Sequence, residues 1–250
     1  MLENVLLKNV MFIDIETVPC ASSLEELGER HANLWDKKAE RINKYREEKL
    51  SSAELFFERG AIYPEFGKIV CISAGVFKET EDSRQFRIKS FYSDDEKQIL
   101  EEFQETLDNN YSINKNYLCA HNGKEFDFPY IARRCLINGV RLPQMLDISG
   151  KKPWETKHLL DTLELWRFGD FKNYTSLDLL ATVFNVETPK DDIKGEDVAH
   201  VYWKDNDINR IKNYCEKDIL TLARVFMHYK GILPMPDEEI IYTEENKEAQ

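Results

Sequence analysis

Two carboxylates, Asp14 and Glu16, follow the apolar run 10–13 and stand two positions apart. On a continuing strand such residues project from the same face, so both carboxylates would reach one site. Acidic residues are depleted in strands, and two on one face repel each other unless a cation or a basic partner lies between them. The pair therefore indicates a metal site, and the alternative is a strand end with two solvated carboxylates.

A third acid, Asp127, lies at a transition from a predicted strand, 116–120, to a predicted helix, 128–137. Ligands of α/β sheets usually bind at such transitions. Helix capping ahead of Pro129 explains the same aspartate without a ligand. The residue alone leaves both interpretations open.

Tyr214 and Asp218 are four positions apart on the predicted helix 207–229, so the phenol and the carboxylate share one face. Together they would reach one target. The alternative is an aromatic residue on a core stripe beside a solvated aspartate, which many helices contain.

The order of these features resembles the DEDDy branch of the RNase H-like 3′–5′ exonucleases, the group that includes the proofreading domains of DNA polymerases. The resemblance rests on residues 12–17, 121–127 and 214–218, so it spans nearly the whole chain. Segment 64–73 is similar to stand-alone predicted exonucleases related to the exonuclease domain of family B DNA polymerases. The sister branch carries a histidine near the last aspartate, whereas residue 213 is asparagine, and Tyr214 is the better match.

The resemblance implies an α/β fold, an RNase H-like mixed β-sheet flanked by helices. It also implies two Mg²⁺ or Mn²⁺ ions about 4 Å apart, since carboxylate oxygens suit such hard cations. We expect Asp14 to bridge both ions, with Glu16 and Asp218 completing the ion that binds the attacking water. Asp127 would support the second ion through water.

Tyr214 would orient that water rather than act as a strong base, because an unperturbed phenol has a pKa of about 10. By resemblance, the main chain at Thr17 and the side chains of Asn122 and Phe126 hold the terminal nucleotide. Asn122 in a simple turn and Phe126 in the core are the alternatives. Asp161 stays open between a supporting and a structural role.

Composition describes a globular protein, with 42% hydrophobic and 32% charged residues. The formal charge of −12 argues against a protein that coats nucleic acid, but bound divalent cations would restore positive potential at a phosphate site. We expect no membrane span, no secretory signal, and a cytoplasmic location. The five cysteines form no CxxC pair and are expected to be reduced, packed thiols.

The remaining pattern predicts one domain, 1–236, with an inserted helical arm, 24–60, and an acidic, loosely attached C-terminal tail, 237–250. The arm has apolar residues at helix-like spacing: Leu27, Leu34, Ile42, Tyr45, Leu55 and Phe56. Strands are predicted at 5–13, 68–77, 85–92 and 116–120, and helices at 94–107, 128–137, 176–184 and 207–229. Ser93 and Glu96 are at the spacing of a capping box for the first of these helices.

These observations predict a metal-dependent 3′–5′ exonuclease that acts on nucleic acid with a 3′ end, single-stranded DNA being favoured over RNA. Two alternatives remain: a non-catalytic RNase H-like module that binds nucleic acid or protein, and an RNA-processing nuclease or endonuclease of the same fold. The arm is expected to cover the substrate, and pairing two subunits or binding a partner protein are its other candidate roles. The oligomeric state stays open.

Overall fold

The computed structural model describes residues 2–79, 84–186 and 193–243. Its centre is a six-stranded sheet with the order β5-β4-β1-β2-β3-β6. The pairs β1–β2 and β2–β3 are antiparallel, whereas β1–β4, β4–β5 and β3–β6 are parallel. The strands are β1 (Val10–Pro19), β2 (Gly67–Glu79), β3 (Arg84–Tyr92), β4 (Tyr117–Ala120), β5 (Leu159–Asp161) and β6 (Ile240–Tyr242).

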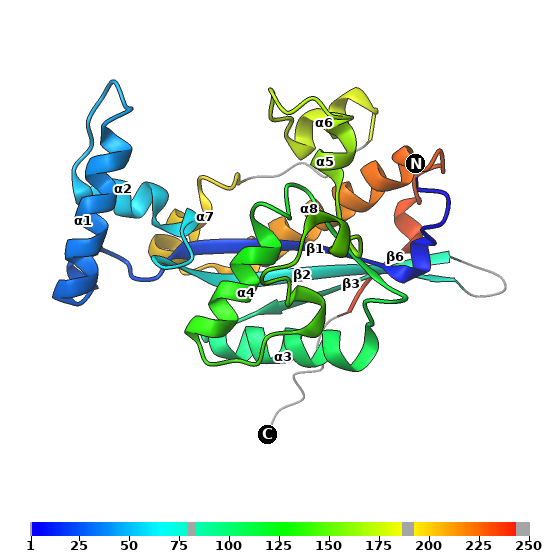
Figure 1. Ribbon diagram of the computed structural model, residues 1–250, viewed down its shortest axis with the longest axis horizontal. Helices are drawn as coiled ribbons and strands as arrows, with labels where there is room; N and C mark the ends of the chain where they lie inside the picture. The colour runs from blue at the N-terminus through cyan, green and yellow to red at the C-terminus, as the bar shows by residue number, and fades with distance from the viewer. Residues whose placement is uncertain (1, 80–83, 187–192, 244–250) are drawn as a thin grey trace.

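Helices flank this mixed sheet, which confirms the expected α/β fold (Figure 1). Helix α3 lies along one face with α4, while α8 lies along the other. Among the described residues, no helix combines the length and apolar character needed to cross a membrane. The helices are α1 (Glu29–Asn43), α2 (Ser52–Arg59), α3 (Glu96–Asn110), α4 (Asp127–Ile137), α5 (Thr162–Arg167), α6 (Leu177–Val183), α7 (Val198–His200) and α8 (Ile208–Tyr229).

Alternation along β1 divides the core into two layers. Met11, Ile13 and Ile15 pack with α3 and α4, whereas Phe12 packs against α8. Successive side chains of a strand point to opposite faces, so the even-numbered residues of β1 all belong on the α8 side. Asp14 and Glu16 are even-numbered, and the strand therefore aims them at α8.

Helix α8 approaches the sheet closely because β2 carries a glycine beneath it. A Cβ atom at Gly75 would lie 2.7 Å from Cγ2 of Ile219 and 2.3 Å from the ring of Phe86. Such distances are far inside van der Waals contact, so a larger residue would lift the helix off the strand. Gly75 thus helps to set the height of α8 above β1.

On the opposite face, a buried ion pair joins α3 to α4. Arg134 donates from Nε to Oε1 of Glu96 at 2.8 Å and from Nη1 to the carbonyl of Pro64 at 2.7 Å. Glu96 also accepts the backbone N–H of Ile69 in β2. The expected capping box is therefore wrong: Asp95 caps α3, and Glu96 is turned inward to tie two helices to the sheet.

Residues 24–60, predicted to form an inserted arm, contain α1 and α2, and these helices share a small core of their own. Trp35 and Ala39 of α1 pack against Leu55 and Phe56 of α2, and a capping box at Ser51 begins α2. Two members of the predicted stripe, Leu34 and Tyr45, are exposed instead. The burial is centred on Trp35 because its ring contacts both Phe56 and Phe66 edge-on.

Two predicted boundaries are wrong. The first strand begins at Val10 rather than residue 5, because residues 7–9 form a 3₁₀ turn, and it continues through the carboxylates to Pro19. The predicted tail is attached over residues 237–243, where β6 pairs in parallel with β3 and the N–H of Thr243 donates to the carbonyl of Ile88. Residues 244–250 lie outside the described residues.

Candidate active site

The centre of the site lies between β1 and α8. Ligand atoms of Asp14, Glu16 and Cys215 all lie within 4.8 Å of one another. The thiol of Cys215 donates to Oδ2 of Asp14 at 3.3 Å, so the helix contacts the first carboxylate directly. The sequence predicted Cys215 only as a packed thiol, and its place between Tyr214 and Asp218 was the available signal.

Tyr214 and Asp218 belong to α8, the helix that also carries Cys215. The hydroxyl of Tyr214 donates a hydrogen bond to the carboxylate of Asp218. Burial raises the pKa of Tyr214, and the negative charges of Asp218, Glu16 and Asp14 raise it further. The phenol therefore keeps its proton at neutral pH, as required of a group that orients water by hydrogen bonding.

Asp127 of α4 is near enough to Asp14 for its charge to raise the pKa of that carboxyl. It is the first residue of that helix and is buried, and the backbone N–H of Ile15 in β1 is a hydrogen-bond donor to it. Burial and the charge of Asp161 together raise the pKa of the Asp127 carboxyl to about 7. The capping alternative is not supported by the hydrogen bonds of α4, because residue 126 is its N-cap and no side chain caps it.

Asp161 holds the loop that leads to Asp127. Its carboxylate caps α5 and also accepts the backbone N–H groups of Asn122 at 2.9 Å and Lys124 at 3.1 Å. Gly123 lies between them, where a Cβ atom would be 2.3 Å from Cβ of Ala120. The aspartate left open by the sequence is therefore a positioning residue.

The three residues expected to hold a terminal nucleotide each have defined local contacts or backbone geometry. Asn122 has a left-handed backbone conformation, with a φ of 60°, as expected of a residue in a turn. Phe126 is half-buried with its ring 5.2 Å from that of Tyr130. The Thr17 hydroxyl donates to the carbonyl of Ala61 at 3.1 Å, so its side chain is bonded to the residue that follows the arm.

The acids are suited to hold divalent cations. Burial raises the pKa of Asp14 well above its ordinary value, as do the charges of Asp218 and Asp127. Burial and the charge of Asp14 likewise raise the pKa of Glu16 well above its ordinary value. Within the described part of the chain, no lysine or arginine forms an ion pair with Asp14, Glu16 or Asp127, so their repulsion is left for a metal to relieve.

Comparison with known proteins gives a matching family and a matching fold. A family described as predicted 3′–5′ exonucleases related to the exonuclease domain of PolB matches residues 62–248. The family B DNA polymerase from the hyperthermophilic archaeon Pyrobaculum calidifontis has a similar structure, with a TM-score of 0.51 and 18% sequence identity. That match covers 87% of this chain and 24% of the polymerase. No curated protein matches the chain.

Proposed function

Because the chain belongs to the family of predicted 3′–5′ exonucleases related to the exonuclease domain of PolB, we propose that it hydrolyses phosphodiester bonds from the 3′ end of nucleic acid. Single-stranded DNA is the proposed substrate. The family match begins at residue 62, so Asp14 and Glu16 precede it, and their role is argued from geometry.

One observation carries the proposal. The charges of Asp127 in α4 and Asp218 in α8 both act on the carboxylates of Asp14 and Glu16 in β1, although these elements are far apart in the sequence. Collecting carboxylates at one place destabilises a fold by repulsion, and proteins retain such clusters at functional sites. Two bound Mg²⁺ or Mn²⁺ ions would supply an activated water and stabilise charge on the phosphate oxygens.

The chain's own residues supply orientation. The Asp127 carboxylate accepts a hydrogen bond from the N–H of Ile15 in β1, and the Tyr214 hydroxyl donates one to Asp218. These bonds fix the orientation of the Asp127 and Tyr214 side chains. We propose that the Tyr214 hydroxyl orients the attacking water. The main chain at Thr17, together with Asn122 and Phe126, would hold the terminal nucleotide.

The test uses three substrates labelled at the 5′ end: single-stranded DNA, a 3′-recessed DNA duplex and single-stranded RNA. Each is incubated with Mg²⁺ or Mn²⁺ and with wild-type protein, Asp14→Asn or Asp178→Asn. Asp178 is an exposed acid on α6, so its variant controls for the same change of charge. We expect shortening from the 3′ end by wild type and Asp178→Asn, and none by Asp14→Asn or with chelator.

The alternatives give different results. Metal-dependent binding without digestion of any substrate would indicate the non-catalytic binding module. Digestion of RNA alone, or cuts inside the strand from the first time point, would indicate an RNA-processing nuclease or an endonuclease. Equal digestion by wild type and Asp14→Asn would show that the acidic cluster is not the site of hydrolysis.

A further inference from the structure

The segment 167–175, which joins α5 to α6, carries exposed aromatic rings that no core explains. Phe168 is 79% exposed, Phe171 is 70% exposed and Tyr174 is 63% exposed. They recur every three residues within one short loop. Solvent contact with large apolar rings is unfavourable, and a cluster of them on a surface is typical of a binding site for another molecule.

The backbone of this segment supports a built surface rather than a loose loop. Phe168 has a φ of 43°, a left-handed conformation that is costly for a bulky residue. Asp170 donates its N–H to the carbonyl of Arg167 at 2.7 Å, and its carboxylate accepts the N–H of Lys172 at 3.0 Å. The strained turn therefore holds its phenylalanine ring outward by local hydrogen bonds.

Both ends of the segment are tied to the loop 121–127, which leads into the acidic site. Nη1 of Arg167 contacts Oε1 of Glu125 at 3.5 Å, and Nε2 of His121 lies 2.9 Å from the carbonyl oxygen of Thr175. Tyr174 is near enough to Asp127 for that charge to raise its pKa, after burial as the larger cause. The aromatic segment is thus continuous with the candidate active site.

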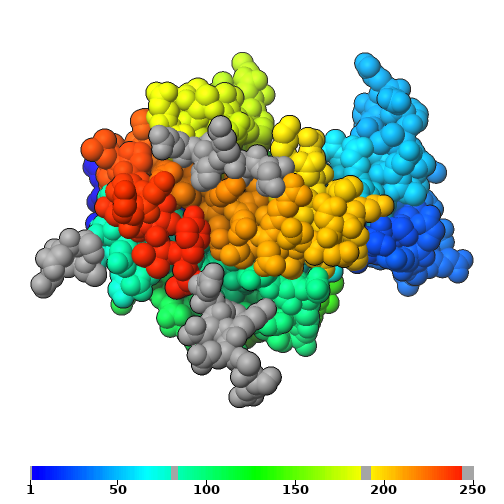
Figure 2. Space-filling view, turned by 180° about the vertical axis from the view of Figure 1, so that it is seen from behind, coloured from blue at the N-terminus to red at the C-terminus, as the bar shows by residue number. Residues whose placement is uncertain are grey.

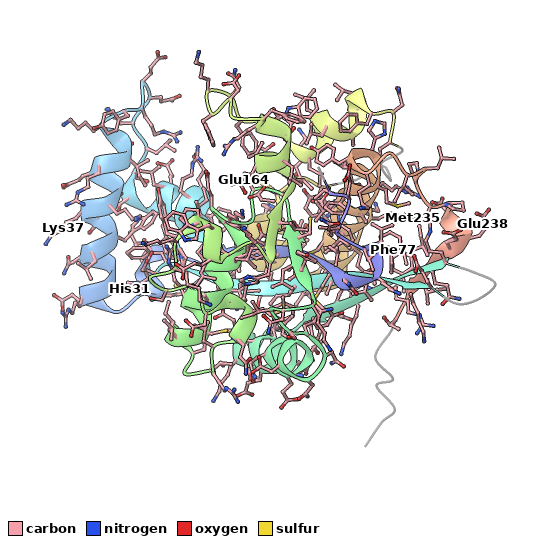
Figure 3. The ribbon with its side chains drawn as sticks, turned by 45° about the vertical axis from the view of Figure 1, so that its right-hand side comes forward. His31, Lys37, Phe77, Glu164, Met235 and Glu238 are labelled. Carbon is pink, nitrogen blue, oxygen red and sulfur yellow. The ribbon has the colours of Figure 1, made fainter. Side chains whose placement is uncertain are left out.

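The position of the segment suits a strand that enters that site. Figure 1 shows α5 and α6 as a projection on the same side of the sheet as the arm, and Figure 2 shows a notch between the two projections from behind. In Figure 3, Glu164 marks α5, and His31 and Lys37 mark α1 across the gap. Lys124 of the acidic-site loop pairs with Glu164 at the base of the projection.

Charge decides which interaction would hold a strand here. The chain has a formal charge of −12, so long-range attraction of phosphates is weak at best. Stacking of bases on aromatic rings needs no net charge and tolerates any sequence. Arg167 adds a guanidinium 5.7 Å from the Phe171 ring, and its buried Nε has no hydrogen-bond partner among the described residues.

We propose that Phe168 and Phe171 form a stacking platform for the single-stranded segment that precedes the 3′ end, outside the site of hydrolysis. The proposal rests on the proposed function for the direction of the strand. The platform binds bases by stacking, and it sets the length of single strand that the protein prefers. Because stacking does not depend on attraction between charges, binding is expected to depend only weakly on salt concentration.

The test measures binding separately from cleavage. Fluorescence anisotropy is recorded with a labelled oligothymidine of about twelve nucleotides, within the range of known single-strand sites. All proteins carry Asp14→Asn so that the strand stays intact. Removing one ring should raise Kd about fivefold or more, since a stacked base contributes about 1 kcal/mol or more. The double variant Phe168→Ala with Phe171→Ala should lose about 25-fold or more.

Three further variants control for folding and for the general loss of an aromatic ring. Trp154→Ala removes a ring that is 63% exposed in a different loop and should leave Kd unchanged. Phe168→Tyr with Phe171→Tyr keeps both rings and should keep the affinity. Phe168→Gly removes a ring but relieves the left-handed strain, so binding should weaken while the melting temperature holds or rises.

The platform and the proposed function fail in different ways. With Asp14 intact, a thymidine dinucleotide too short to reach the platform should be cleaved equally by wild type and the double variant. Loss of twelve-nucleotide binding alone supports the platform even if no substrate is cleaved. The proposal would be overturned by an unchanged Kd in the double variant or by an equal loss of affinity in Trp154→Ala. It would also be overturned if the protein with Asp14→Asn alone did not bind the oligonucleotide.

Discussion

Asp127→Asn should stabilise the metal-free protein at alkaline pH. The Asp127 carboxyl has an ordinary pKa of 3.8, which the fold raises to about 7, first through burial and then through Asp161. Below about pH 4 the group is protonated in both the folded and the unfolded chain. As the pH rises toward 7, only the unfolded chain gains by releasing the proton, so folding stability falls across this window.

The magnitude follows from the same values. A rise from 3.8 to about 7 at about 1.4 kcal/mol per pH unit makes the largest loss about 4 kcal/mol. Asparagine cannot ionise, and its amide oxygen still accepts the N–H of Ile15. We therefore expect Asp127→Asn to exceed wild type by roughly 2–4 kcal/mol at about pH 8, and to match it near pH 4.

The measurement is urea unfolding in the presence of chelator at these two pH values. With a slope of about 3 kcal/mol per molar urea, the expected difference moves the midpoint by about 1 M at the higher pH. Comparing variant with wild type cancels the histidines, whose lowered pKa values act in the opposite direction. Equal midpoints at pH 8, or a wild type that is more stable there than the variant, would refute this account of Asp127.

Four other changes test other parts of the structure. Adding Mn²⁺ at about pH 8 should raise the unfolding midpoint of wild type more than that of Asp14→Asn, because the ion binds the folded site. Arg134→Met should cost about 3–5 kcal/mol in urea unfolding, since Glu96 is left buried and unpaired. Tyr214→Phe should lower kcat with little change in KM, and an unaltered kcat would exclude the orienting role. Deleting the arm, 24–60, should weaken DNA binding, and unchanged affinity in a folded variant would count against a substrate cover.

Much of the fold followed from periodicity. The even spacing of Asp14 and Glu16 correctly placed both on one face, because alternation in a strand is set by covalent geometry. The last helix and its shared face for Tyr214 and Asp218 were likewise predictable, since i and i+4 residues always lie together on a helix. Local rules therefore sufficed wherever a site residue depends on its own element.

Long-range contacts were not predictable in this way. Glu96 has the spacing of a capping residue, yet it is turned inward because Arg134, 38 positions away, offers a buried charge. Leu34 and Tyr45 have apolar spacing, but Trp35 fills the small core of the arm. The tail composition gave no sign of β6, whose three residues are stabilised by the free edge of β3.

The hydrogen bond between Cys215 and Asp14 joins residues that are 201 positions apart, and this separation has a consequence for synthesis. A ribosome synthesises β1 long before α8, so Asp14 and Glu16 leave the ribosome before the helix that packs against them exists. Contacts of such long range also form slowly, because closing a longer loop costs more conformational entropy. The candidate active site is therefore among the last parts of the protein to form, because it is incomplete until α8 has docked.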